Sequence, residues 1–131
     1  MSFRLLSVAA VAVLLAGPAC AETVARTVKA NQRTPVAGLF TYERETCRAA
    51  EIPNLSFRSR PTHGSIAIHQ VTVPLGPDTT CQGRRISGPA LVYTPNKGFR
   101  GQDQFTIEYP FATNEVRSPT LFTRTFVITV E

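Results

Sequence analysis

The chain has 131 residues, with 14 Lys or Arg against nine Asp or Glu, and its formal net charge is +5. This length allows one domain with a modest core and excludes an architecture of several domains. The basic residues are dispersed and are not interleaved with aromatic residues, which argues against a nucleic-acid-binding surface. A mild dispersed charge permits contact with an anionic glycan and more often simply keeps a domain in solution.

The first 21 residues have the pattern of a secretory signal peptide. Arg4 gives a positive start, the apolar run Leu5–Leu15 follows, and Ala19-Cys20-Ala21 matches the small-residue cleavage site. The apolar run is shorter than the roughly 20 residues that a membrane-spanning helix needs. We therefore expect cleavage after Ala21, a mature chain of residues 22–131 without a transmembrane segment, and a periplasmic or secreted location.

The three cysteines agree with export. Lipid attachment at Cys20 is the less favoured alternative, because Pro18 and Ala19 separate the cysteine from the Leu-Ala-Gly run that this processing requires. Signal cleavage would remove Cys20 and leave Cys47 and Cys81, an even number in an oxidising compartment. We predict one disulfide between them, closing a loop worth roughly 4 kcal/mol in the chain-entropy model.

Strand signals recur through the rest of the chain, and no segment has the apolar periodicity of an amphipathic helix. Pro, Gly, Asn and Asp residues separate short β-branched and aromatic stretches. The predicted strands are Val24–Ala30, Val36–Tyr42, Leu55–Ser59, Ser65–Val73, Ile86–Thr94, Asp103–Tyr109 and Leu121–Val130. About seven short strands with frequent turns predict a single all-β domain, either a β-sandwich or a small barrel.

Two segments between these strands lack the strand pattern. Glu43–Glu51 is expected to form a loop or one helical turn around Cys47. Gly76–Gly83 is expected to be a surface loop, because turn-forming residues dominate it.

One stretch of the chain carries a recognisable motif. It runs Tyr93-Thr94-Pro95, then Gly98-Phe99-Arg100-Gly101, then Asp103-Gln104-Phe105, and Pro61-Thr62-His63-Gly64-Ser65 precedes it. The pattern resembles the Tyr-x-Pro…Gly-Phe-x-Gly-x-Asp-x-Phe signature of bacterial immunoglobulin-like and cadherin-like modules, and it is also similar to small stand-alone exported proteins that carry this module. The resemblance implies an Ig-like antiparallel β-sandwich of about seven strands with one disulfide.

Each signature residue has a structural explanation. Gly64 permits a tight turn, Pro95 ends a strand, and Gly98 and Gly101 allow left-handed backbone. Phe99 is expected to plug one end of the sandwich. Asp103 is expected to accept backbone N–H groups. The structural signature set is His63, Gly64, Tyr93, Pro95, Gly98, Phe99, Gly101, Asp103 and Phe105.

Some larger members of this family bind calcium between tandem modules. This chain has one copy of the motif and scattered acidic residues, whereas calcium prefers clustered carboxylates and carbonyls. We therefore expect no calcium ligands and no cofactor.

Arginines supply the most interesting surface candidates. Arg58, Arg60, Arg84, Arg85 and Arg100 would form an anion-binding site if the fold brought them together, because guanidinium groups bind carboxylate and phosphate bidentately. The alternative, which we favour from the sequence, is that they point in different directions as solubilising charges.

Catalytic and metal-binding patterns are weak. His63 and His69 are six positions apart, which on one strand corresponds to roughly 20 Å and is too far for one metal ion. The sequence has no Gly-x-Ser-x-Gly motif and no spacing that indicates a Ser-His-Asp triad. Glu43, Glu45 and Glu51 fit a solvated face better than a pair of catalytic carboxylates.

These observations predict a non-catalytic binding or structural module of the bacterial cell envelope. Its partner is expected to be an envelope protein or an anionic glycan. The alternative is a small periplasmic inhibitor or accessory subunit that docks through an edge strand or the Gly76–Arg85 loop. A hydrolase is the remote third reading.

Overall fold

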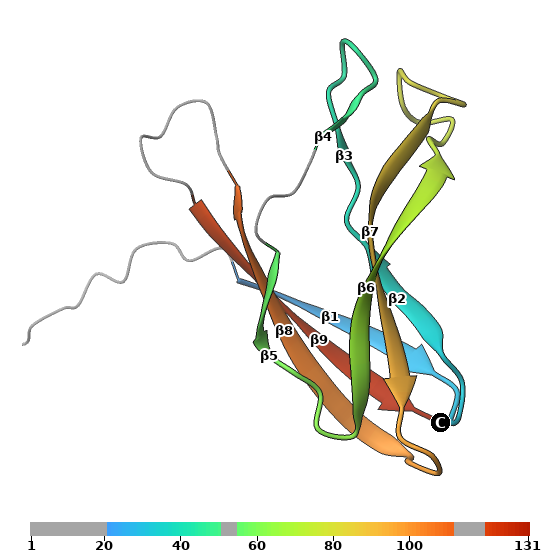
Figure 1. The fold of residues 1–131 in the computed structure, drawn as a ribbon, viewed down its shortest axis with the longest axis vertical. Helices are drawn as coiled ribbons and strands as arrows, with labels where there is room; N and C mark the ends of the chain where they lie inside the picture. Colours follow the sequence, from blue (N-terminus) through green and yellow to red (C-terminus); the bar gives the residue numbers. More distant parts are fainter. Residues whose placement is uncertain (1–20, 51–54, 112–119) are drawn as a thin grey trace, which may run out of the picture.

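The computed structural model describes residues 21–50, 55–111 and 120–131, and the predicted signal peptide lies outside these ranges except for Ala21. No helix occurs in the described residues. The strands are β1 (Ala21–Val28), β2 (Thr34–Gly38), β3 (Thr41–Tyr42), β4 (Ala49–Ala50), β5 (Ser56–Ser59), β6 (Gly64–Pro74), β7 (Arg85–Pro95), β8 (Gly101–Phe111) and β9 (Thr120–Val130). The prediction of an all-β chain is confirmed (Figure 1).

Two main sheets organise these strands. A four-stranded sheet has the order β1-β9-β8-β5, a three-stranded sheet has the order β2-β7-β6, and β3 and β4 form a separate pair. The two main sheets lie close together where the chain ends and diverge toward the opposite end (Figure 1). The β6–β7 hairpin tip and the β3–β4 pair therefore stand apart from the far ends of β8 and β9.

The expected antiparallel sandwich of about seven strands differs from the structure in two ways. β1 runs parallel to β9, in a continuous register from Ala21 opposite Thr123 to Val28 opposite Val130. The described residues also form nine strands, because the predicted strand Val36–Tyr42 is divided and β4 lies within the region expected to be a loop or a helical turn. Glu51, the last residue of that region, lies outside the described residues.

The predicted strand Val36–Tyr42 is divided between β2 and β3. Leu39 interrupts it, since its side chain is buried in the core while its N–H donates to the carbonyl oxygen of Pro89. The ring of Phe40 then lies over two strand glycines, Gly38 and Gly88, at distances where a Cβ atom would collide with it. Glycine in these two strands thus makes room for an aromatic ring.

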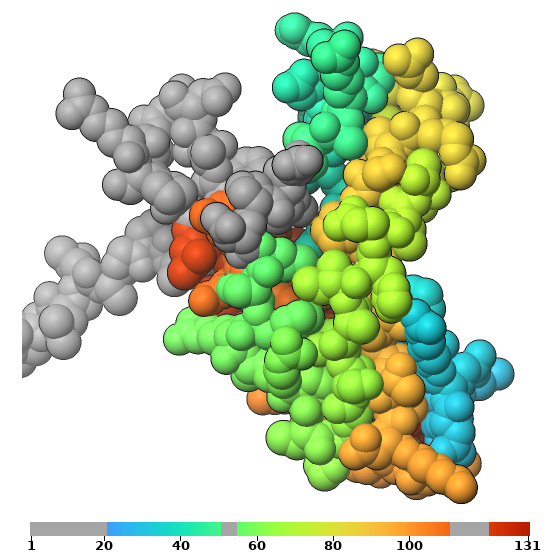
Figure 2. Space-filling view, in the orientation of Figure 1, coloured from blue at the N-terminus to red at the C-terminus, as the bar shows by residue number. Residues whose placement is uncertain are grey.

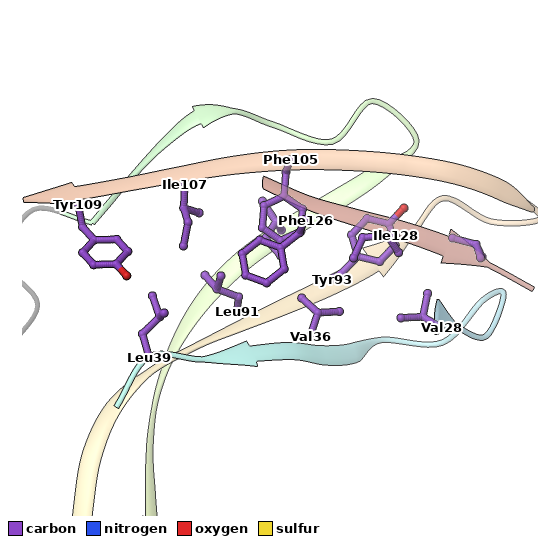
Figure 3. Packing of buried hydrophobic residues seen from close by; sticks show 12 residues of the cluster. Val28, Val36, Leu39, Leu91, Tyr93, Phe105, Ile107, Tyr109, Phe126 and Ile128 are labelled. Atoms are coloured by element: carbon purple, nitrogen blue, oxygen red, sulfur yellow. The ribbon is translucent and has the colours of Figure 1, made fainter. Parts of the chain in front are cut away.

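The core fills the space between the two main sheets (Figure 3). Phe105, Ile107 and Tyr109 alternate along β8, as the sequence predicts, and all three are buried. Phe105 is directly opposite Phe126 on β9, and their rings stack at 4.9 Å between centroids. Full burial of such side chains stabilises the fold by about 1.5–3 kcal/mol each.

The apolar positions of β6 change phase along the strand. Ile66 is buried in the core and Ile68 shares its face, whereas farther along the apolar residues are Val71 and Val73, on the opposite face. Val71 and Val73 line a shallow groove together with Phe40 and Ala90. The first half of β6 therefore packs against the four-stranded sheet, and the second half packs toward Phe40.

Candidate functional site

The signature residues converge on the carboxylate of Asp103, which is 5 % exposed. The backbone N–H groups of Thr62 and His63 each donate to it at 3.0 Å, and the hydroxyl of Tyr93 donates at 2.8 Å. The N–H of Gln104 donates at 2.9 Å. One buried side chain thus fixes the turn before β6 to β7 and β8.

The rest of the signature surrounds this carboxylate. The ring of His63 stacks on Phe99 with 4.3 Å between centroids, and Phe99 packs against the core. Gly98 and Gly101 adopt positive φ angles of 76° and 130°. Pro95 is the last residue of β7, and Phe105 is fully buried. These contacts hold the turns at one end of the two sheets, and Asp103 has its oxygens occupied by the protein's own donors.

Gly64 lies where no side chain fits. A Cβ atom there would be 2.6 Å from the backbone oxygen of Thr94 and 2.7 Å from the Tyr93 hydroxyl. We expect Gly64→Ala to destabilise the fold by about 1–3 kcal/mol, as overpacking usually does. Urea unfolding would measure the loss. Gly76→Ala is the matched control, because no atom lies within 4 Å of a Cβ built there; equal stability of the two variants would contradict the expectation.

The surroundings of the Tyr93 phenol raise its pKa. Burial raises its pKa first, and the hydrogen bond to Asp103 and the charge of that carboxylate raise the pKa further. In the unfolded chain a tyrosine ionises near pH 10. Above that pH the unfolded chain loses the Tyr93 proton while the folded chain retains it, so stability should fall by up to about 1.4 kcal/mol per pH unit.

Urea unfolding at pH 9 and at pH 11 would test this dependence. Tyr93→Phe has no proton to lose at this position, so its stability should fall less between the two pH values than that of the wild-type protein. An equal fall in both would contradict a special role of Tyr93.

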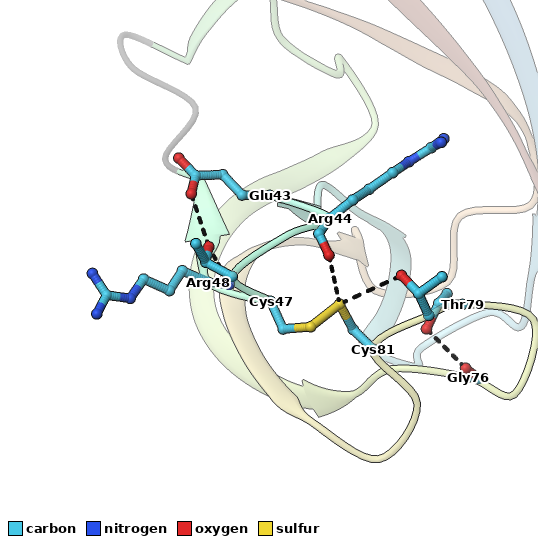
Figure 4. Close-up of a disulfide and its surroundings, with 9 residues drawn as sticks. Glu43, Arg44, Cys47, Arg48, Gly76, Thr79 and Cys81 are labelled. Atoms are coloured by element: carbon cyan, nitrogen blue, oxygen red, sulfur yellow. Dashed lines mark hydrogen bonds between the residues drawn. A yellow bond between two sulfur atoms is a disulfide. The ribbon is translucent and has the colours of Figure 1, made fainter.

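A second candidate site lies at the far end of the three-stranded sheet, in two loops joined by the disulfide. We call these loops, residues 42–50 and 75–85, the disulfide-tied tip. The predicted disulfide joins Cys47, in the turn between β3 and β4, to Cys81, in the loop between β6 and β7, with 5.6 Å between their Cα atoms. Cys81 is 2 % exposed, and its sulfur lies 3.6 Å from the carbonyl oxygen of Arg44 (Figure 4). Two loops distant in sequence thus form one surface (Figure 2).

Internal hydrogen bonds order both loops of the disulfide-tied tip. The N–H of Cys47 donates to the carbonyl of Glu43, and the Thr46 hydroxyl donates to the Glu43 carboxylate at 2.8 Å. In the other loop, the N–H groups of Leu75 and Gly83 donate to the carbonyls of Arg84 and Leu75, respectively. A polar hollow of about 210 Å³ lies between the loops; its lining is Tyr42, Arg44, Asp78, Thr79 and Thr80.

Sequence reasoning placed Arg84 and Arg85 in a candidate site but missed Arg44 and Arg48. All four are exposed residues of the disulfide-tied tip, and the side chains of Arg44 and Arg48 extend away from the disulfide (Figure 4). The sequence could have indicated both arginines, because they lie close to Cys47 in the chain. The predicted disulfide brings that segment next to Cys81 and Arg84.

The five predicted anion-binding arginines are not brought together. Arg85 begins β7 and Arg100 follows its end, and a strand of 11 residues is about 35 Å long. Arg60 lies over the ring of Phe57 at 4.6 Å, in a cation–π contact, and Arg85 donates to the carbonyl of Thr72. Arg58 is an exposed residue of β5. Only Arg84 and Arg85 belong to the disulfide-tied tip.

The two histidines have separate surroundings. His63 stacks on Phe99, while His69 on β6 forms a hydrogen bond of 2.7 Å with Arg33. Among the described residues, no three His, Cys, Asp or Glu side chains are grouped so that they could hold a metal ion. No helix in that part of the chain is long and apolar enough to span a bilayer.

The sequence and the structure were also compared with known proteins. No family model matches the chain, and neither the curated proteins nor the solved structures gave a match.

Proposed function

We propose that the protein is an exported, non-catalytic binding module of the bacterial cell envelope, an Ig-like domain that holds its partner at the disulfide-tied tip. The clamped pair of loops is the observation that carries this proposal. Binding residues are commonly placed on loops that a rigid scaffold positions, and here a packed two-sheet body carries two loops that a disulfide holds side by side. The signal-peptide pattern supports export.

The exposed guanidinium groups of the tip favour an anionic partner. Arg44, Arg48, Arg84 and Arg85 give it four positive charges, against Glu43, Glu45 and Asp78. Guanidinium groups bind carboxylates and sulfates or phosphates of a glycan through paired hydrogen bonds. An acidic envelope glycan or an acidic surface of an envelope protein fits this arrangement.

A glycan array and a pull-down from envelope extracts, both with purified protein, would identify the partner. The double variant Arg44→Gln and Arg84→Gln should lose most of the binding. The matched control is Arg58→Gln and Arg100→Gln, which removes two exposed positive charges outside the tip and should bind as the wild-type protein does. Equal loss in both variants would refute docking at the tip, and hydrolytic turnover without a stable ligand would refute a non-catalytic role.

One observation favours a second function, an accessory subunit or inhibitor that docks by strand addition. β6 is an edge strand of the three-stranded sheet, and its 11 residues include no Asp, Glu, Lys or Arg. Long uncharged edges readily pair with a strand of another chain. Ala67→Lys should then abolish capture of a partner protein, whereas Ala25→Lys on the edge strand β1 should not; unchanged capture by Ala67→Lys would exclude the β6 edge.

A further inference from the structure

A charged side chain occupies a core-facing position of β9. Arg124 is directly opposite Ile107, in the same register that places Phe126 opposite Phe105 and Phe122 opposite Tyr109. Because residues two apart on a strand share a face, Arg124 belongs to the row that forms the core. Its side chain is 29 % exposed. Charged residues are rare at core positions, so a charge there calls for a structural or functional explanation more than a charge on the surface does.

Arg124 lies in an apolar cleft at the end where the two main sheets diverge. The cleft has a volume of about 280 Å³, and Tyr109, Phe122 and Arg124 line it on the four-stranded sheet. Leu39 and Phe40 line the opposing wall. Tyr109 and Leu39 lie at the same end of the core, away from Val28 (Figure 3). A second hollow of about 350 Å³ shares Tyr109, Phe122 and Arg124 and extends toward Glu22.

The lining combines flat apolar rings with one cation. The rings of Tyr109 and Phe122 are stacked on each other at 5.8 Å with 13° between their planes, so this wall of the cleft is aromatic. The Nε of Arg124 lies 2.7 Å from Oε2 of Glu22, whose side chain is 58 % exposed. A guanidinium has five N–H donors, and within the described ranges Glu22 is the acceptor that the structure gives Arg124.

We propose that this cleft binds a small aromatic monocarboxylate, with its ring against Tyr109 and Phe122 and its carboxylate on the guanidinium of Arg124. Aromatic rings favour offset stacking or edge contacts with one another, and a carboxylate matches the guanidinium fork bidentately. A monoanion fits better than a phosphate dianion, because Glu22 already balances the single positive charge. The site is separate from the disulfide-tied tip, and neither proposal depends on the other.

The two partners of the ion pair should respond in opposite directions. Calorimetric titration of the purified protein with cinnamate would use cinnamamide as the uncharged control ligand. Arg124→Gln should weaken cinnamate binding by about tenfold or more, the scale of a lost charge-assisted hydrogen-bond pair. Glu22→Ala removes the competing carboxylate and should strengthen binding severalfold. Arg100→Gln, outside the cleft, should leave binding unchanged.

Each outcome decides the proposal. Weaker binding by Arg124→Gln together with stronger binding by Glu22→Ala supports it, because a merely structural ion pair would make both substitutions act in the same direction. Equal binding of cinnamamide and cinnamate, or no cinnamate binding at millimolar concentration, would overturn it. Tighter binding of decanoate than of cinnamate would overturn the aromatic class. The ligand comparison and Glu22→Ala decide the question even where Arg124→Gln fails to fold.

Discussion

Asp103→Ala is expected to destabilise the folded protein by about 3–5 kcal/mol. That is a large part of the free energy of unfolding of a single domain, which is about 5–15 kcal/mol. The substitution removes the acceptor for two backbone N–H groups of the turn before β6, for the N–H of Gln104 and for the Tyr93 hydroxyl. The Tyr93 hydroxyl would then be buried without its partner, and an unsatisfied buried donor costs about 1–3 kcal/mol by itself.

Urea unfolding followed by circular dichroism would measure this loss. Asp78→Ala is the matched control, since Asp78 is exposed in the loop between β6 and β7 and surface substitutions usually change stability by less than about 0.5 kcal/mol. Asp103→Asn keeps one oxygen acceptor and should fall between the two. If Asp103→Ala were as stable as Asp78→Ala, the turn would be held by something other than this carboxylate.

Loss of the Cys47–Cys81 disulfide is the second large effect. The bond closes a loop across 34 residues of sequence, and the chain-entropy model gives a stabilisation of roughly 4 kcal/mol for a loop of this length. In the described part of the chain, β3 and β4 are two residues each and form a sheet separate from the two main sheets. Reduction should therefore lower the melting temperature and release the β3–β4 hairpin from the β6–β7 loop.

The measurement is thermal unfolding of the oxidised and the reduced protein. The double variant Cys47→Ala and Cys81→Ala should melt like the reduced wild-type protein, and adding reductant should not change its melting temperature further. Partner binding gives a second readout, because the proposed docking at the disulfide-tied tip uses both loops. An oxidised and a reduced form with the same melting temperature would show that the disulfide is structurally idle.

Local patterns predicted the strands and the disulfide. The alternating pattern of Asp103–Tyr109 and the β-branched residues of Ser65–Val73 are local features of the sequence. Such features identify a strand without information from the rest of the chain. Burial of Phe105, Ile107 and Tyr109 follows from the same alternation. The pairing of the cysteines followed from the predicted signal peptide, whose removal leaves an even number, Cys47 and Cys81.

Properties that depend on distant segments were not predictable. The parallel pairing of β1 with β9 joins the two ends of the described chain, and neither strand carries a sign of its partner. β4 and its pairing with β3 also escaped prediction, because a two-residue strand is shorter than any periodic pattern. The phase change in β6, from Ile66 to Val71 and Val73, was visible in the sequence, but its meaning required the position of Phe40.

In the candidate sites too, the sequence predicted local features and did not predict contacts between distant segments. The sequence identified Asp103 as an acceptor for backbone N–H groups and could not place its donors. It named five arginines that the strands then separate, and it passed over Arg44, which the disulfide brings to the tip. Alternation already placed Arg124 on one strand face with Phe122 and Phe126, but the cleft around it and its contact with Glu22 appear only in the structure.

The parallel pairing of β1 with β9 sets an order of events for a chain that is synthesised from one end. β1 is the first described strand to emerge, yet each of its residues pairs with a β9 residue 102 positions later in the sequence. Contacts between such distant segments form late and slow the folding of β proteins. The four-stranded sheet can therefore be completed only after β9, the last strand of the chain, has been synthesised.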